Sequence, residues 1–401
     1  MVKTSRLFNV SSQHSDERGH MHRRFLQLMT YLFCLMTVAA FAAEPLQTVT
    51  LTPVGGVPAR LTGRVLVEAQ DGGILFEERS GQLHNLAPKE FTSFVARSGA
   101  FSYLPPDDLA ALLLQQTGAG SDIHLTEHFV ICSDASELYT TFCGVLLEKV
   151  FAEYMKFFEG SDVQLTSLTT KLPVLVFRDV ARFQEFAGRQ HPDTDFTDVP
   201  GYYSVRDNQM LITAISGDRD FRTNSDVVRE LKKKPRQVET IVHEAVHQLA
   251  FNTGLQVRFA DNPMWLSEGL AVFFERASGR SSTIWSRPGE VSQIHLPGFH
   301  AATRQNRLRL PLSELLESDQ AFQSADKLAD AYAEGWAVTY FLIRSDKAAF
   351  NRLVSHLQHR KPLQAVDATT RLAEFEAATG KPLEDFERYF LRYMSRVRAR
   401  P

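Results

Sequence analysis

The chain has 401 residues, of which 44% are hydrophobic and 23% charged. This is the composition of a soluble globular protein with room for two or three domains. The formal net charge is −3, so the overall charge gives no electrostatic case for binding nucleic acid.

The N-terminus carries the one strongly apolar run of the chain, residues 25–41, with two arginines directly before it. A small-x-small site follows and ends at Ala42. This order predicts a signal peptide over residues 1–42 and an exported protein, periplasmic or extracellular, with no membrane association after cleavage. The run is short for spanning a bilayer, but an uncleaved anchor is the alternative. Translation from Met21 in place of Met1 would give a signal of conventional length.

Three cysteines are present, and Cys34 leaves with the predicted signal. Cys132 and Cys143 remain as an even pair in an exported chain, which is compatible with a disulfide. Two buried thiols, one on a strand and one on a helix, are the equally weighted alternative. Neither cysteine has metal-ligand spacing.

Residues 46–100 are predicted to form a small β-rich domain. Apolar and polar residues alternate along its first half, and two turns containing glycine follow. We expect a barrel or sheet of SH3-like size that packs against the rest of the chain, with ligand binding as the alternative. Residues 88–121 read as a connector that holds one helix, over residues 107–116.

A second, larger domain is predicted over residues 122–401. Its first part, residues 122–254, is expected to carry a small mixed sheet. The expected strands lie at 128–132 and 172–178, with a hairpin over 201–204 and 210–213. A long helix is expected to begin at Ser133 or Asp134 and to end near Phe158.

The stretch ETIVHEAVHQLAFNTG contains His243, Glu244 and His247. Apolar residues follow helical spacing through it, so we predict a helix over residues 237–252. Residues four apart on a helix lie on the same face, so both imidazoles can reach one ion. Glu244 lies about 100° further round the helix, close enough to reach a water on that ion. This is the H-E-x-x-H pattern of zinc hydrolases, in which the glutamate is the general base.

A third ligand is needed, because catalytic zinc usually has three protein ligands and one open position. Glu268, in the stretch WLSEGLA, is the predicted one. It follows His247 by 21 positions, which leaves room for a turn and a second helix that crosses the first. The alternative is a pair of histidines satisfied in a core, with Glu244 and Glu268 exposed.

The residues HEAVHQLAFNTGL and PMWLSEGLAVFFE resemble the gluzincin metallopeptidases. They are most similar to an uncharacterised exported bacterial family of the peptidase MA-like group. The likeness runs from about Ile123 to the C-terminus, but only these two motifs are specific. It implies that Glu244 activates water, and that zinc is bound by His243, His247 and Glu268.

The resemblance implies three further features. Gluzincins place an edge strand above the metal to pair with extended substrate, and the hairpin over residues 201–213 is the candidate, with an ordinary sheet strand as the alternative. Tyr332, in the pattern A-Y-x-x-x-W, is a candidate to stabilise the oxyanion, with packing beside Trp336 as the alternative. Thermolysin-type gluzincins carry an acid four residues after the ligand glutamate to orient a histidine. That position is Val272 here, so another group must orient it.

The second part of the catalytic domain, residues 255–401, is predicted to be helical. The expected helices lie at 312–317, 324–344, 348–359, 369–379 and 382–398. A loop-rich stretch over 278–310 holds His295 and His300. Either histidine could bind substrate, but a surface residue with no role is the favoured interpretation.

These observations predict an α+β protein in which a small β unit precedes a gluzincin-like catalytic domain. The predicted activity is zinc-dependent hydrolysis of peptide bonds in a polypeptide substrate by a metal-activated water. Glu244 would take the proton from that water and deliver it to the leaving amine. Two alternatives remain: an exported non-catalytic binding or scaffold protein that retains a zinc site, and a zinc hydrolase that acts on cell-wall peptides.

Overall fold

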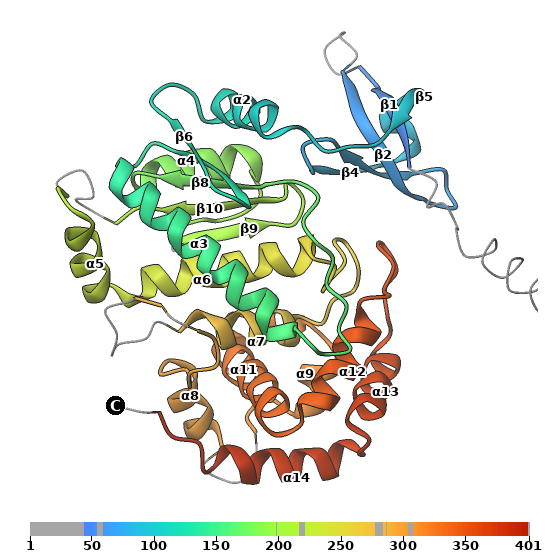
Figure 1. Cartoon of the computed structure of the whole chain (residues 1–401). Helices are drawn as coiled ribbons and strands as arrows, with labels where there is room; N and C mark the ends of the chain where they lie inside the picture. Colours follow the sequence, from blue (N-terminus) through green and yellow to red (C-terminus); the bar gives the residue numbers. More distant parts are fainter. Residues whose placement is uncertain are drawn as a thin grey trace, which may run out of the picture.

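The computed structural model describes residues 44–53, 59–197, 199–215, 221–276, 284–285, 287–303 and 308–399. The predicted signal over residues 1–42 lies outside these ranges. Within them the protein is of the mixed α+β class, with two small sheets and a helical C-terminal half (Figure 1). In this described part of the chain, no helix is both long and apolar enough to cross a membrane.

The first sheet is antiparallel and lies to one side of the molecule (Figure 1). Its strands are β1 (Pro45–Leu51), β2 (Arg60–Glu68), β3 (Ile74–Glu78), β4 (Leu83–Leu86) and β5 (Phe91–Ala100). They lie in the order β4-β3-β2-β1-β5. The described strands therefore form an open sheet with β4 and β5 at its edges. Its small core consists of Val49, Ile74, Phe76 and Leu86.

Strand β5 corrects the expectation that residues 88–121 form a connector with one helix. After a single 3-10 turn (Pro88–Glu90), β5 pairs antiparallel with β1. Nearly every residue of β5 is exposed, including Phe94 and Val95. With neither face buried, apolar and polar residues need not alternate along β5. The alternation from which a strand is predicted is therefore missing. The expected helix is present as α2 (Pro106–Thr117).

The second sheet positions the candidate site. Its strands are β6 (Asp122–Leu125), β7 (Phe129–Ser133), β8 (Leu172–Phe177), β9 (Gly201–Ser204) and β10 (Gln209–Thr213). They lie in the order β6-β7-β8-β10-β9. The three central strands run parallel, and the two edge strands are antiparallel to their neighbours. Asn208, with a φ of 56°, turns the chain between β9 and β10, so the predicted hairpin is present.

Helices cover both faces of this sheet. Helices α2 and α4 (Val180–Gln190) pack on one face, and α3 (Glu137–Phe158) and α6 (Pro235–Asn252) on the other. Cys132 of β7 belongs to the first of these cores and Cys143 of α3 to the second. Both are buried free thiols. The disulfide alternative is therefore wrong, because the sheet lies between the two side chains.

Helix α3 begins later than either expected cap. Ser136 is the N-cap, and its Oγ accepts a hydrogen bond from Tyr139 N at 3.3 Å. Ser133 instead ends β7, and the Asp134 carboxylate accepts from Arg178 N at 2.6 Å. Neighbouring Ser and Asp residues are all good caps, so tertiary contacts decide which one starts the helix.

The remaining described helices lie in and beside the C-terminal half. They are α5 (Asn224–Lys233), α7 (Met264–Glu275), α8 (His295–Ala302), α9 (Leu312–Glu317), α10 (Gln320–Gln323), α11 (Leu328–Ser345), α12 (Lys347–Leu357), α13 (Ala368–Thr379) and α14 (Leu383–Met394). Helix α8 lies in the stretch expected to be loop-rich, and the single helix expected over residues 324–344 begins instead at Leu328, after the short α10. Helix α7 lies between α6 and α11 (Figure 1).

A buried ion-pair network attaches the first sheet to the second domain. Glu77 of β3 is 1% exposed and accepts a hydrogen bond from Arg64 Nε at 2.8 Å. It also pairs with Arg258, from the loop after α6, which donates to the carbonyl of Gly81 as well. A backbone hydrogen bond from Leu83 N to the carbonyl of Arg206, 2.8 Å long, adds to this contact.

Candidate metal centre

Helix α6 buries its apolar face in the core, so its polar face points away from the core. Pro235 occupies the first turn, where a missing N–H costs nothing, and Gly254, with a φ of 73°, follows the end. Within residues 241–250, all side chains are buried except those of three residues. These three are His243, Glu244 and His247. The sheet-facing core therefore presents the whole motif on one accessible face.

Helix α7 brings Glu268 to that face. The neighbouring Gly269 touches α11: a Cβ there would lie 2.2 Å from Thr339 Oγ1 and 2.6 Å from the carbonyl oxygen of Gly335. Only glycine permits so close an approach of two helices. The packing of α7 against α11 thus sets the position from which Glu268 reaches α6.

Three potential ligand side chains converge between α6 and α7. His243 Nε2 lies 3.1 Å from His247 Nε2 and 3.1 Å from Glu268 Oε2, and His247 Nε2 lies 3.4 Å from Glu268 Oε1. Ligands bonded to zinc at about 2.0–2.1 Å in a tetrahedron are roughly 3.3 Å apart. The donor set and its spacing therefore fit a Zn²⁺ ion. The side chains are 13–15% exposed, so solvent can reach them.

Negative charge exceeds positive charge around these atoms. Besides Glu268, the acids Glu239, Glu244 and Glu275 lie on the facing parts of α6 and α7. Burial, together with the charge of Glu275, raises the pKa of Glu239 to about 7. Buried like charges are costly unless a cation neutralises them. The electrostatics therefore favour a bound cation independently of the ligand spacing.

Glu244 lies beside the donor atoms without being one of them. Its Oε2 accepts a hydrogen bond from the backbone N–H of Tyr203, at 2.8 Å, and Tyr203 belongs to the edge strand β9. Burial raises the pKa of Glu244, although His243 and His247 oppose this. A carboxylate with a raised pKa is a stronger base near neutral pH. The same contact occupies one outward backbone donor of β9.

Glu275 is a site residue that the sequence analysis missed. Its Oε2 lies 3.0 Å from His243 Nδ1, and Val272, at the position where thermolysin-type enzymes carry an acid, is buried. A carboxylate on Nδ1–H fixes the tautomer that leaves Nε2 free to bind a metal. The signal was an acid seven positions after Glu268, which is two helical turns away on the same face.

Two aromatic side chains of the helical half approach the donor atoms. Burial, together with the charge of the adjacent Glu268, raises the pKa of Tyr332 on α11. The His295 ring stacks on Tyr332 with centroids 6.1 Å apart, and burial lowers the pKa of His295. His295 is thus half-buried beside the site, whereas the His300 Nε2–H donates a hydrogen bond to the carbonyl of Met394 near the chain end, at 3.1 Å. The packing of α8 places His295 beside the site and His300 away from it, and sequence patterns do not predict that packing.

A second group of possible ligands consists of Glu127, His128 and Glu148. His128 Nδ1 lies 2.7 Å from Glu148 Oε2, and the His128 backbone N–H donates to Glu148 Oε1 at 2.7 Å. Glu127 is exposed. Since His128 and Glu148 already satisfy each other, this group is explained as an ordinary surface ion pair.

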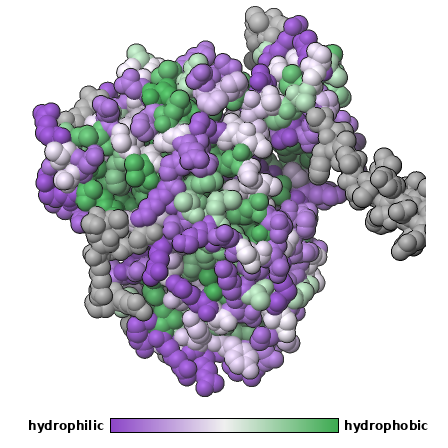
Figure 2. Space-filling model, viewed as in Figure 1, coloured by the Kyte–Doolittle hydropathy of each residue, from purple (hydrophilic) through white to green (hydrophobic). Residues whose placement is uncertain are grey.

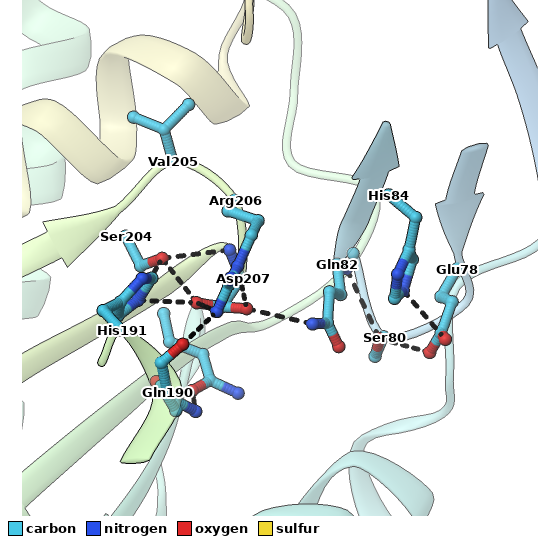
Figure 3. Close-up of polar contacts among 12 residues, drawn as sticks. Glu78, Ser80, Gln82, His84, Gln190, His191, Ser204, Val205, Arg206 and Asp207 are labelled. Carbon is cyan, nitrogen blue, oxygen red and sulfur yellow. Dashed lines mark hydrogen bonds and ion pairs between the residues drawn. The ribbon is translucent and has the colours of Figure 1, made fainter. Parts of the chain in front are cut away.

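Ser204, His191 and Asp207 gather at the turn between β9 and β10 (Figure 3). Ser204 Oγ donates to Asp207 Oδ2 at 2.7 Å, and His191 Nε2 lies 3.0 Å from the same oxygen. In a catalytic triad the histidine contacts serine and acid through opposite nitrogens. Here the serine is bonded directly to the acid, so the group does not fit nucleophilic catalysis. Gln82 of the first sheet donates to Asp207 Oδ1 at 3.0 Å, which makes the cluster part of the contact between the two sheets.

The chain is similar to a known family over the region that contains the candidate metal centre. No curated protein matches the chain. A family described as "Protein of unknown function (DUF1570)" matches over residues 237–364. This range contains His243, Glu244, His247, Glu268 and Tyr332, and it is the stretch over which the chain is similar to that family.

Proposed function

We propose that this protein is a zinc-dependent metallopeptidase of the gluzincin type, exported through its N-terminal signal. The convergence of His243 Nε2, His247 Nε2 and a Glu268 carboxylate oxygen carries the proposal. These atoms have the chemistry and the spacing expected of three protein ligands to zinc, and a catalytic zinc site would keep its fourth position for water. The match over residues 237–364 covers these residues but assigns no activity.

The residues around the site can divide the work of peptide hydrolysis. A bound zinc ion would polarise the scissile carbonyl and lower the pKa of a water to about 7. Glu244, held by the Tyr203 N–H, would accept the proton of that water and pass it to the leaving amine. Tyr332, whose raised pKa keeps its hydroxyl protonated, would donate a hydrogen bond to the developing oxyanion.

The substrate would be a polypeptide in extended conformation. Strand β9 is an edge strand, and an edge strand can pair with a peptide backbone. It has only four residues, and Glu244 occupies the N–H of Tyr203. We therefore infer that β9 aligns a short stretch of substrate next to the site.

The test uses the full purified chain and two variants, Glu244→Gln and Glu384→Gln. Zinc content is measured by mass spectrometry, and cleavage is measured on a denatured-protein mixture and on cell-wall peptides, with and without a chelator. Glu384 is an exposed residue of α14, so Glu384→Gln should behave as the parent does. Both proteins are expected to bind about one zinc per chain and to cleave denatured protein in a chelator-sensitive manner.

Glu244→Gln separates the proposal from its alternatives. It is expected to keep zinc and to lose about 10²–10⁴-fold in turnover, because only the proton acceptor is removed. Zinc without chelator-sensitive cleavage in the parent would contradict the proposal and favour a binding protein. Cleavage confined to cell-wall peptides would assign the same site to a different substrate.

A further inference from the structure

A large cavity lies in the helical half and shares no residue with the candidate metal site. Its volume is about 1180 Å³. Its wall is formed by Arg276 directly after α7, the loop before α8, the end of α11, and the chain from the end of α13 through α14 to Arg398. Hydrophilic residues cover this lower end of the molecule, where α14 lies (Figures 1 and 2). Four sequence segments that are distant in the chain therefore meet there.

The wall of this cavity is strongly basic. Its cationic residues are Arg276, Arg287, Arg344, Lys381, Arg392, Arg396 and Arg398. Among the described residues, two acids line it, Glu290 and Asp346, and the Asp346 carboxylate accepts a hydrogen bond from the Ala349 N–H as the cap of α12. The cavity therefore concentrates positive charge in a chain whose net charge is −3.

None of these cations has a carboxylate within ion-pair distance among the described residues, although the charge of Arg276 reaches Glu239 and acts to lower its pKa. None of the seven takes part in an ion pair there, whereas eleven arginines elsewhere in the described chain do. Backbone carbonyls accept hydrogen bonds from four of them: Arg276 donates to Val291, Arg344 to Gly289, Lys381 to Thr379, and Arg398 to Ser395 and Val397. The Arg344 guanidinium also lies 5.7 Å from the ring centroid of Tyr340. These charges are held in place but not neutralised.

Stabilisation of helix ends does not account for the cluster. Basic residues in the last turn of a helix offset its dipole, and this applies to Arg344 of α11 and Arg392 of α14. Arg276 is the C-cap of α7. The remaining four, Arg287, Lys381, Arg396 and Arg398, lie outside the described helices. Concentrating like charges without partners costs free energy, so the arrangement calls for a bound anion.

We propose that this cavity binds a ligand that carries several phosphate groups. Six of the seven cations are arginines, whose planar fork binds phosphate through two parallel hydrogen bonds. The volume is slightly above the roughly 300–1,000 Å³ of typical small-molecule sites, so a ligand of that size can be accommodated. Tyr389, 56% exposed at the wall, can cover the apolar part of such a ligand. The phosphates could belong to a soluble oligophosphate or to a clustered lipid headgroup.

The experiment measures binding directly, so it is independent of any peptidase activity. Tripolyphosphate is titrated into the full chain by calorimetry at fixed ionic strength, and vesicles with and without a phosphatidic acid component are sedimented with the protein. The test variant is Arg392→Glu with Arg396→Glu, both exposed side chains without a described ion pair. The matched control is Lys232→Glu with Arg388→Glu, which makes the same charge change outside the cavity.

Saturable binding of tripolyphosphate, weakened at least about tenfold in the test variant and unchanged within about twofold in the control, supports the proposal with a soluble source. Binding only to the acidic vesicles, lost in the same variant alone, supports it with a lipid source. Absence of both, or equal loss in test and control variants, overturns it. Thermal unfolding of each variant establishes that the comparison is between folded proteins.

Discussion

Glu275 contacts the candidate site through His243 Nδ1, the ring nitrogen that faces away from the other ligand atoms. Its carboxylate is 11% exposed and 3.0 Å from Nδ1. Removing such an orienting acid typically costs about 10–100-fold in metal affinity. We expect this loss of zinc affinity in Glu275→Ala, measured by competition with a chelating dye. Glu275→Gln retains an acceptor for Nδ1–H and should lose less. Parent-like affinity in the alanine variant would contradict the assigned role.

Glu334 of α11 makes a prediction about pH. It is fully buried, one carboxylate oxygen has no hydrogen-bond partner among the described residues, and burial raises its pKa to about 8. An unfolded glutamate ionises near pH 4.3. Between these two values the unfolded state releases a proton that the folded state keeps, so the free energy of unfolding falls as pH rises.

The Glu334→Gln variant should therefore be less sensitive to pH. Its urea midpoint is expected to change less between pH 5 and pH 8 than that of the parent, with both proteins kept in excess chelator. Glu384→Gln, at an exposed position, should behave as the parent does. An unchanged pH dependence in Glu334→Gln would show that the buried carboxyl is not the source.

Among the elements, the pair α7 and α11 carries the tightest packing near the site. In Gly269→Ala the new Cβ would overlap Thr339 and the backbone of Gly335, so the helices must separate. Overpacking of this kind costs about 1–3 kcal/mol, and we expect both a lower urea midpoint and weaker zinc binding. Gly298→Ala on α8 is the control, because its Cβ would meet only Ala333 at an ordinary 3.7 Å.

Element by element, local patterns were informative where one face of a segment is buried. Helix α6 follows its apolar spacing and begins at Pro235, and the β9–β10 hairpin follows its turn. Strand β5 lacks the signal because it is exposed, and the start of α3 depends on what Ser133 and Asp134 contact elsewhere. Residues near the site likewise fall into those that helical spacing predicts and those whose positions depend on tertiary packing.

Within the candidate site, the H-E-x-x-H spacing and the distance to Glu268 are readable from the sequence because each lies on a regular helix. The contact of Glu275 with His243 depends on how α7 crosses α6, and that of His295 with Tyr332 depends on where α8 packs. The basic cavity draws on several separate segments. Such convergence is a property of the tertiary fold, so no single stretch of sequence reveals it.

For the whole molecule, the attachment of the first sheet rests on the buried Glu77. Glu77→Gln removes the charge that pairs with Arg64 and Arg258. Arg64 keeps its pair with Glu44, but the largely buried Arg258 is left without a carboxylate partner among the described residues. Breaking a buried pair from one side costs about 3–5 kcal/mol. We expect the first sheet to unfold separately from the second domain, seen as two calorimetric transitions and as faster proteolysis over residues 101–105. Glu78→Gln, whose partner His84 lies in the same sheet, should retain the behaviour of the parent.

The separation of Cys132 and Cys143 by the central sheet has a consequence for biosynthesis. Since the two sulfur atoms lie in different cores, the native state requires no oxidant and no isomerase. Protein made in a reducing cytosol and protein recovered from an oxidising exterior should reach the same thermal midpoint, and added dithiothreitol should leave it unchanged. The stability of the fold should therefore be the same in the reducing cytosol and in the oxidising exterior to which the chain would be exported.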